Sequence, residues 1–267
     1  MIRTTHRPKR SLGQNFLQDQ GTAAKIVASL DAPTNARVLE IGPGQGALTR
    51  WLNQSGCTLH ALEKDADLAA ELKARWPDLS LLVMDALEFP WERLHGPWNI
   101  IGNLPYNVAS PIIWDVVSRV SDLERGIFMV QKEVADRIAA IPGNRSYGAL
   151  SVWVQSHVQV RRLFVVGPHV FYPRPKIDSA VIRFLPLPNE ERTTCGPALR
   201  KLLNICFQQR RKQLKTILRS FWHEYLTMWL IDQGLKPECR PEELSPKQFQ
   251  HLAQLLFAVE AVNHSVT

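Results

Sequence analysis

The chain has 267 residues, 45% of them hydrophobic, and a formal net charge of +7 with a pI of about 9.4. A chain of this size and apolar content can bury one larger core and a smaller one. No apolar run approaches the roughly 18 residues of a membrane span, and the first ten residues lack the apolar core of a secretory signal. The N-terminus is Arg-rich, which is also compatible with a short transit peptide. The basic charge favours partners that carry phosphates, and we expect a cytoplasmic monomer without membrane contact.

Short apolar strands and helices alternate over the first 140 residues. Helices are predicted at about residues 20–29, 47–54, 66–75, 110–118 and 132–140. Strands are predicted at residues 37–41, 58–63, 79–84, 99–102 and 126–130. Ser110 is expected to cap its helix, with Pro111 as the first helical residue. This alternation is typical of a mostly parallel sheet covered by helices on both faces.

Two more strands, at residues 158–165 and 180–185, have no long helix between them. They should form an antiparallel pair at the edge of the sheet and bring it to seven strands. Beyond a linker at residues 186–190 the pattern is helical only, with helices predicted at residues 199–221, 225–233 and 246–261. We therefore predict an α/β, Rossmann-like domain over residues 1–187 and a small all-α domain over residues 188–267.

The four cysteines are scattered, and no two of them have the spacing of zinc ligands. The eight histidines form no pair at the spacing that metal sites on helices use. These observations favour a reduced protein with neither a disulfide framework nor a metal.

A glycine-rich turn, Gly42 to Gly46, follows the first predicted strand of the sheet. Such a turn lets the backbone approach a ligand closely at the carboxyl edge. Glu63 ends the second strand, where a carboxylate can accept both hydroxyls of an adenosine ribose, as found in NAD and in S-adenosylmethionine. Asp85 follows the third strand and can accept the adenine amine of the cofactor, or can cap a helix. The series of Gly42, Gly44, Glu63 and Asp85 on successive strand ends is typical of methyltransferases that use S-adenosylmethionine.

The segment Asn103-Leu104-Pro105-Tyr106 follows the fourth strand at the same edge. Its chemistry fits methylation of the N6 amine of adenine, whose lone pair is delocalised into the ring. Two acceptors, the side-chain oxygen of Asn103 and the backbone carbonyl of Leu104, can hold the amine hydrogens and free that lone pair. Pro105 biases Leu104 toward an extended conformation, and Tyr106 offers a face on which the base can stack.

Together with the glycine turn and this segment, residues 12–17, 171–181 and 206–214 resemble the rRNA adenine N6,N6-dimethyltransferases over about residues 9–255. The resemblance implies dimethylation of two adjacent adenosines in the 3′-terminal hairpin of 16S rRNA, within the immature small ribosomal subunit. It also implies that Asn15, Leu17 and Asn103 contact the cofactor. Phe171 would approach the target adenine opposite Tyr106, although an aromatic residue at this position can also belong to the core.

Basic residues recur on the predicted helix over residues 199–221. Arg211, Lys215 and Arg219 share one face of that helix, flanked by Arg210 and Lys212. This face can meet RNA phosphates, or can simply be solvated. The N-terminal arm adds four further cations that can fold over the RNA and the cofactor: Arg3, Arg7, Lys9 and Arg10.

Three other functions share parts of these patterns. Macrolide-resistance enzymes that methylate 23S rRNA have the same catalytic segment, but residues 176–180 and 209–212 favour the small-subunit class. A mainly non-catalytic assembly factor would bind RNA or subunits without depending on S-adenosylmethionine. An NAD-dependent oxidoreductase is supported only by the glycine turn and Glu63.

Overall fold

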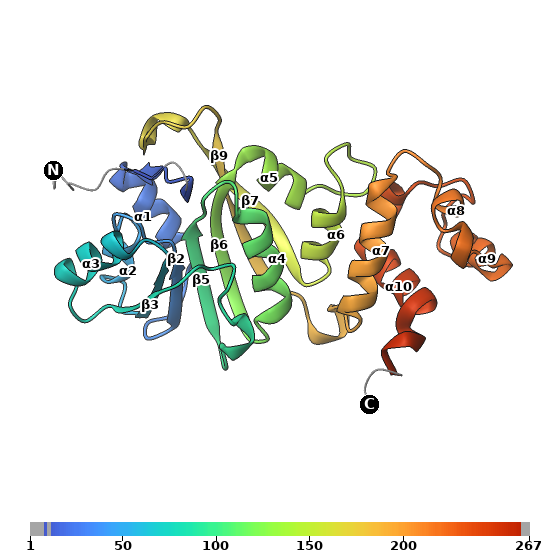
Figure 1. Ribbon diagram of the computed structural model, residues 1–267, viewed down its shortest axis with the longest axis horizontal. Coiled ribbons are helices and arrows are strands. Elements are labelled where there is room, and N and C mark those ends of the chain that lie inside the picture. The colour runs from blue at the N-terminus through green and yellow to red at the C-terminus, as the bar shows by residue number, and fades with distance from the viewer. Residues whose placement is uncertain (1–7, 10–11, 263–267) are drawn as a thin grey trace. The chain divides into compact units, whose positions relative to one another are not determined.

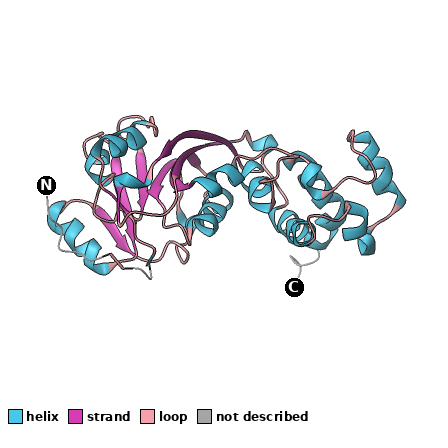
Figure 2. Ribbon diagram, turned by 90° about the horizontal axis from the view of Figure 1, so that it is seen from above, coloured by secondary structure: helices cyan, strands magenta, loops and turns pink. Residues whose placement is uncertain are grey.

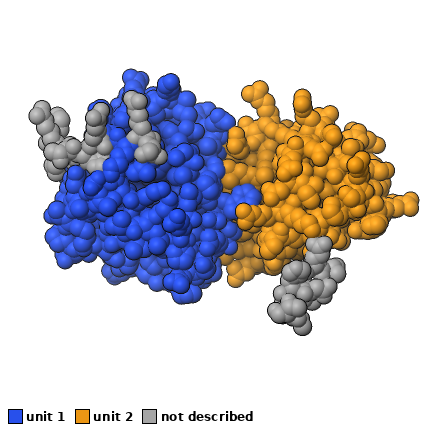
Figure 3. Space-filling model, in the orientation of Figure 1, with its two compact units in different colours: residues 1–135, 159–186 blue, residues 136–158, 187–267 orange. Residues whose placement is uncertain are grey.

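The computed structural model of the chain describes residues 8–9 and 12–262, with side chains up to residue 257. The chain forms two compact units (Figure 3). Unit 1 comprises residues 1–135 and 159–186, and unit 2 comprises residues 136–158 and 187–267. The predicted domains, residues 1–187 and 188–267, differ from these units in assigning residues 136–158 to the first domain.

Unit 1 is a seven-stranded sheet in the order β4-β3-β2-β5-β6-β9-β7, with helices on both sides (Figures 1 and 2). Its strands are β2 (Arg37–Ile41), β3 (Thr58–Glu63), β4 (Ser80–Val83), β5 (Trp98–Asn103), β6 (Leu123–Gln131), β7 (Val158–Val166) and β9 (Ser179–Pro186). Its helices are α1 (Gln20–Ala28), α2 (Thr49–Leu52), α3 (Ala66–Arg75) and α4 (Ala109–Arg119), and α5 (Lys132–Ile138) leads into unit 2. The predicted Rossmann-like architecture is confirmed.

The first five strands of the sheet, from β4 to β6, run parallel, so their carboxyl ends meet at one edge. Ile41 on β2 pairs with Leu62 on β3 and with Gly102 on β5, and Glu63 pairs with Val83 on β4. This register brings the glycine turn, Glu63 and the segment after β5 to the same place. β9 runs antiparallel to β6, and β7 lies beside β9 at the sheet edge, as the prediction of an antiparallel edge required.

The start of α4 differs from the prediction. The carbonyl of Pro105 accepts hydrogen bonds from the backbone amides of Val108 and Ala109, so the helix begins at Ala109 with Val108 as its N-cap. Ser110 and Pro111 therefore lie inside the first turn, and Ser110 is not the cap. Pro111 is tolerated there because amides of the first turn have no partner within the helix.

A second, two-stranded sheet in unit 1 was not predicted. β1 (Phe16–Leu17) pairs antiparallel with β8 (Phe171–Tyr172), so that Phe16 faces Tyr172 and Leu17 faces Phe171. The pairing joins two segments about 155 residues apart, and neither is long enough to show a strand periodicity. The pairing thereby fixes the segment before α1 against the rest of unit 1.

In the residues that the structure describes, unit 2 is built from helices and loops. They are α6 (Ala149–Gln155), α7 (Gly196–Gln208), α8 (Leu214–Ile217), α9 (Glu224–Asp232) and α10 (Pro246–Val262). α6, which was not predicted, packs against α7 and α10. None of the helices in this part of the chain combines the length and the apolar character needed to cross a membrane.

The helix predicted over residues 199–221 is interrupted in the structure. α7 ends at Gln208, α8 begins at Leu214, and residues 219–221 form a separate 3-10 turn. The break is held by tertiary contacts, since the backbone amide of Leu214 donates to the carbonyl of Cys239 at 2.8 Å. Arg211, Lys215 and Arg219 therefore do not share one continuous helical face.

Candidate functional site

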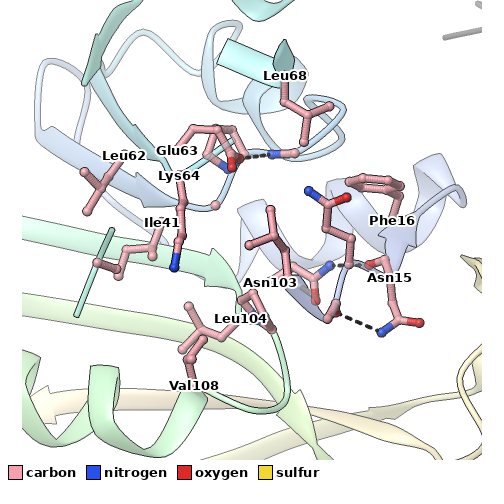
Figure 4. A pocket seen from close by; sticks show the side chains of 18 of the residues that line it. Asn15, Phe16, Ile41, Leu62, Glu63, Lys64, Leu68, Asn103, Leu104 and Val108 are labelled. Carbon is pink, nitrogen blue, oxygen red and sulfur yellow. Dashed lines mark hydrogen bonds between the residues drawn. The ribbon is translucent and has the colours of Figure 1, made fainter. Parts of the chain in front are cut away.

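A pocket lies at the carboxyl edge of the sheet in unit 1, and Figure 4 shows it from close by. It is formed by residues 12–17, the turn after β2, the ends of β3 and β4, and the segment after β5. The residues predicted for the cofactor and for catalysis that line it are Asn15, Leu17, Gly42, Gly44, Glu63, Asp85, Asn103, Leu104, Pro105 and Tyr106.

Glu63 presents a buried carboxylate to this pocket. Its side chain accepts hydrogen bonds from the backbone amides of Gly44, at 3.0 Å, and Asp65, at 2.9 Å. Burial raises the pKa of Glu63, while the two amide donors oppose that rise. The carboxylate is thus held in one orientation at the end of β3, where it can accept further hydrogen bonds from a ligand.

The glycine turn gives the pocket an open backbone wall. Gly42 and Gly44 have φ angles of +65° and +56°, which side-chain-bearing residues rarely adopt. A Cβ added at Gly42 would have no atom within 4 Å, so the space beside this backbone is open. A ligand can therefore lie directly against the turn.

Asp85 lies after β4 and has two partners in the structure. It forms an ion pair with Lys64 at 2.6 Å, and it accepts a hydrogen bond from the backbone amide of Leu87 at 3.0 Å. Burial opposes ionisation of Asp85, but the hydrogen bonds from Lys64 and Leu87 outweigh it and lower the pKa. Asp85 caps a local turn and at the same time lines the pocket as an anion.

The side-chain amide of Asn103 has a defined orientation. Its Nδ2 donates to the backbone carbonyl of Asn15 at 3.1 Å (Figure 4). A carbonyl can only accept, so the nitrogen of the amide must face Asn15, and the oxygen is left as an acceptor for another group. This is the atom that the proposed activation of an amine requires.

Leu104 is held by its own backbone. Its amide donates to the carbonyl of Met129 on β6 at 3.0 Å, and its side chain is buried. Among the described residues, no hydrogen bond reaches the Leu104 carbonyl. Both predicted acceptors, on Asn103 and Leu104, are thus fixed at the end of β5.

Tyr106 is half-buried, and its position depends on a residue that the sequence analysis missed. The Tyr106 hydroxyl forms a hydrogen bond of 2.7 Å with Oγ of Ser179, the fully buried first residue of β9. Burial raises the pKa of Tyr106, so the hydroxyl stays protonated at neutral pH. The sequence could have suggested Ser179 only through the segment 171–181, because the contact joins residues far apart in the chain.

Glu40 is a second site residue that the sequence analysis did not single out. It lies within the apolar strand β2, is 1% exposed, lines the pocket and accepts a hydrogen bond from Oγ1 of Thr49 at 2.7 Å. Burial, reinforced by the nearby charge of Glu63, raises the pKa of Glu40 to about 8. A carboxyl in an otherwise apolar strand directly before the glycine turn was the available indication.

Phe171 is not brought to the pocket. Its ring is 4% exposed and belongs to the core cluster that includes Leu17 and Val166, whereas the neighbouring Tyr172 is 62% exposed. In this structure Phe171 is a core aromatic residue, the second of the two alternatives, and its ring has no face open to a base. Its role beside the target adenine stays a prediction.

The basic residues predicted for RNA lie in unit 2. Arg210 is engaged within that unit, by an ion pair of 2.5 Å with Glu242 and a hydrogen bond of 3.3 Å to the carbonyl of Asn144. The other four are exposed on the turn and short helices after α7: Arg211, Lys212, Lys215 and Arg219. Of the N-terminal cations, Lys9 is described, and Arg3, Arg7 and Arg10 lie outside the described residues.

The described residues fit S-adenosylmethionine. The pocket combines an open glycine backbone, a buried carboxylate at the end of β3 for ribose hydroxyls and an anionic Asp85 for an adenine amine. Its wall also contains apolar side chains, among them Ile41, Leu62 and Ile112. In the described part of the chain, no three or more His, Cys, Asp or Glu side chains gather as metal ligands.

Comparison with known proteins identifies relatives over nearly the whole chain. The family model for ribosomal RNA adenine dimethylase matches residues 5–257. The ribosomal RNA small subunit methyltransferase A of Oleidesulfovibrio alaskensis is 53% identical over 257 residues, which cover 94% of this chain and 91% of that protein. The protein of the same name from Pseudomonas aeruginosa is 39% identical, with 94% and 95% covered.

Two solved structures share the fold. A dimethyladenosine transferase from Plasmodium falciparum has a TM-score of 0.76 at 24% identity, covering 92% of this chain and 98% of that one. The 23S rRNA methyltransferase ErmE has a TM-score of 0.70 at 23% identity, covering 90% and 99%. The extent of the family match and the identity to the curated relatives, together with the geometry of the pocket, lead to one conclusion: the chain belongs to the ribosomal RNA adenine dimethylase family.

Proposed function

We propose that the chain transfers methyl groups from S-adenosylmethionine to N6 of two adjacent adenosines in the 3′-terminal hairpin of 16S rRNA, in the immature small ribosomal subunit in the cytoplasm. The observation that carries this proposal is the orientation of Asn103, whose amide nitrogen is occupied by the Asn15 carbonyl while its oxygen is free to accept from an amine. The small-subunit substrate is supported by the names and the identity of the curated relatives.

Asn103 and Leu104 act by holding the target amine. In the first transfer the Asn103 side-chain oxygen and the Leu104 carbonyl accept its two hydrogens, and in the second transfer one of these acceptors holds the single hydrogen that remains. These hydrogen bonds draw the nitrogen out of conjugation and expose its lone pair. Both acceptors are fixed before the substrate arrives. The Asn103 amide nitrogen donates to the Asn15 carbonyl, and the Leu104 backbone amide donates to the Met129 carbonyl. The ring of Tyr106, anchored by Ser179, gives the adenine a surface on which to stack, worth about 1–3 kcal/mol.

When bound, S-adenosylmethionine supplies an electrophilic methyl group on a sulfonium that leaves as a neutral thioether. Each transfer forms one N–C bond, breaks one S–C bond and releases one proton from the amine. Because the leaving group needs no protonation, positioning supplies most of the acceleration, roughly 7 kcal/mol or more. The target adenosine must first leave its stack, which is cheapest in a hairpin loop.

Asn103→Ala tests the proposal most directly. The variant lacks the side-chain acceptor, so we expect the transfer rate to fall by at least about a hundredfold. Binding of S-adenosylhomocysteine should persist in calorimetry. Dimethylation is measured by mass spectrometry of the 3′ hairpin after reaction with immature small subunits, and naked 23S rRNA serves as the alternative substrate.

Glu63→Ala is the matched control, since it should weaken binding of S-adenosylhomocysteine. Wild-type turnover by Asn103→Ala would refute the amine-holding role. Methylation of 23S rRNA in place of the small subunit would refute the substrate.

A further inference from the structure

The segment before α1 is tied to the start of α3 by four described residues. Nζ of Lys9 contacts Asp65 at 2.7 Å and Asp67 at 2.8 Å, and Nε2 of Gln14 donates to Asp65 at 3.0 Å. The backbone amide of Lys9 donates to Oε1 of Gln14 at 2.7 Å, which joins the two donors to each other. We call Lys9 with residues 12–17 the strap, and the group of Lys9, Gln14 and Asp65 the latch.

Asp65 is a buried partner for the partly exposed Lys9. Its side chain is fully shielded from solvent, while the side chain of Lys9 is 41% exposed. Asp65 also caps α3, because it accepts from the backbone amide of Asp67. Burial by itself would raise the pKa of Asp65, but the hydrogen bonds from Lys9, Gln14 and the Asp67 amide outweigh it and lower the pKa. A buried carboxylate of this kind depends on its donors, so the strap has one preferred attachment point.

At its other end the strap forms part of the pocket itself. Leu12 to Leu17 line the pocket, and the Asn15 carbonyl accepts from Nδ2 of Asn103. A Cβ added at Gly13 would lie 2.8 Å from Oδ1 of Asn107, and one added at Gly44 would lie 3.1 Å from the ring of Phe16. The strap therefore packs directly on both the glycine turn and the segment after β5.

We propose that Lys9, Gln14 and Asp65 are positioning residues: their latch holds the strap as a wall of the cofactor pocket and thereby fixes the Asn103 amide for catalysis. The catalytic half of this inference rests on the proposed function, whereas the cofactor half does not. Asp65 is next but one to Glu63, whose carboxylate accepts from the Asp65 amide. The attachment point of the strap and the ribose acceptor thus lie on the same turn after β3.

Two effects follow from this arrangement. A ligand under the strap leaves faster when the latch is broken, because the wall formed by residues 12–17 opens more often. The Asn103 amide also loses its fixed partner in the open state, so turnover of bound substrate falls while affinity for RNA does not change. A latch that only stabilised the fold would change neither quantity below the melting temperature.

The binding test uses the full chain with S-adenosylhomocysteine and no RNA. Lys9→Met should raise the dissociation constant about threefold to fivefold through faster dissociation, as expected for a partly exposed ion pair. Asp65→Asn, which keeps a helix-capping side chain, should raise it about tenfold. Lys9→Arg keeps a cation that can pair with Asp65, so its dissociation constant should equal that of the wild type. Lys247→Met is the matched control, because it removes a lysine ion pair with Glu191 in unit 2.

Hydrogen exchange measures the strap itself. Amides of residues 12–17 should exchange faster in Lys9→Met and Asp65→Asn, and the double variant should show less than the sum of the two single effects, because the two side chains share one contact. Unchanged dissociation rates in both single variants would overturn the proposal. Faster dissociation without faster exchange in residues 12–17 would also overturn it. The loss of a charge near the pocket would then explain the weaker ligand binding without any opening of the strap.

Turnover gives the last comparison. With immature small subunits as substrate, Lys9→Met should lower kcat and leave the KM for RNA unchanged, and Lys9→Arg should restore kcat. An equal kcat in Lys9→Met and the wild type at saturating cofactor would contradict the positioning of Asn103. If the wild type itself transfers no methyl group, the proposed function fails, while the binding and exchange measurements still decide the cofactor half of the latch.

Discussion

Two buried carboxyls, those of Glu40 and Glu63, line the pocket, yet their surroundings differ. Glu63 accepts from two backbone amides, whereas Glu40 accepts from the Thr49 hydroxyl. Burial raises the pKa of both, and that of Glu40 reaches about 8, so Glu40 carries a proton at neutral pH. Glu63, with its backbone donors, is therefore the better acceptor for ribose hydroxyls, and Glu40 contributes to the wall of the pocket.

The protonation of Glu40 predicts a pH dependence of stability. Below the ordinary pKa of 4.5 both the folded and the unfolded chain hold the proton, and the contribution of Glu40 is fully present. As the pH rises from there through about 8, the unfolded chain releases its proton first, so stability is lost at up to about 1.4 kcal/mol per pH unit. Glu40→Gln keeps an acceptor for Thr49 but has no proton to lose.

Urea unfolding of the ligand-free protein at about pH 5.5 and about pH 8.5 measures this contribution. The wild type should lose more of its free energy of unfolding between these pH values than Glu40→Gln does. Equal losses in the two proteins would show that Glu40 titrates normally in the folded state.

At the residue scale, the sequence was sufficient to predict those pocket residues whose location depends on their position along a strand. Gly42, Glu63 and Asp85 follow or end strands that run parallel, so they had to converge, and Asn103 ends the next such strand. Asn15 and Leu17 precede the sheet and were predicted only from the resemblance. Ser179 and the Lys9–Asp65 pair could not be predicted in this way. Each depends on contacts between segments that no local pattern connects, and such contacts become visible only when the chain is folded.

Elements with strong local patterns were predicted closely. β2, β3 and α3 have the predicted bounds, because an apolar run or an N-cap defines each of them. The helix over residues 199–221 was predicted wrongly, because its apolar spacing continues through a break that Leu214 makes by bonding to Cys239. α2 is likewise shorter than predicted, with only Thr49–Leu52 helical.

The break after α7 contains two kinds of basic residue, exposed ones and one that is paired within unit 2, and this predicts different effects on RNA binding. Arg211 and Lys212 are exposed, so replacing both with alanine should weaken binding to small-subunit RNA and lower its salt dependence by about one unit of slope per lost phosphate contact. Arg210→Ala removes the ion pair to Glu242 and should lower the melting temperature.

Filter binding at several salt concentrations and thermal unfolding distinguish these outcomes, with binding of S-adenosylhomocysteine as the control for both proteins. A double variant with wild-type RNA affinity would show that the turn after α7 is simply solvated. A larger loss of RNA affinity in Arg210→Ala at full stability would assign the phosphate contact to Arg210.

For the whole molecule, the net charge of +7 predicts that its two ligands respond differently to salt. Affinity for RNA should fall by about tenfold or more between about 50 and about 200 mM salt, because binding releases counterions from the phosphates. Affinity for S-adenosylhomocysteine, whose site uses buried groups, should change little. Parallel titrations of both ligands test this, and RNA binding that is independent of salt would contradict a phosphate-based interface.

Unit 2 is built from two separate stretches of the chain, with residues 159–186 of unit 1 between them. This arrangement affects both the folding of the chain during synthesis and the replacement of unit 2 by recombination. Residues 136–158 leave the ribosome before β7 and β9 exist, yet α6 packs against α7 and α10, which are made last. A single recombination point in the gene therefore cannot replace unit 2 as a whole. A chain cut after residue 187 would complete the sheet but expose the buried side chains of Val152, Trp153 and Val154, so the two units have to be inherited together.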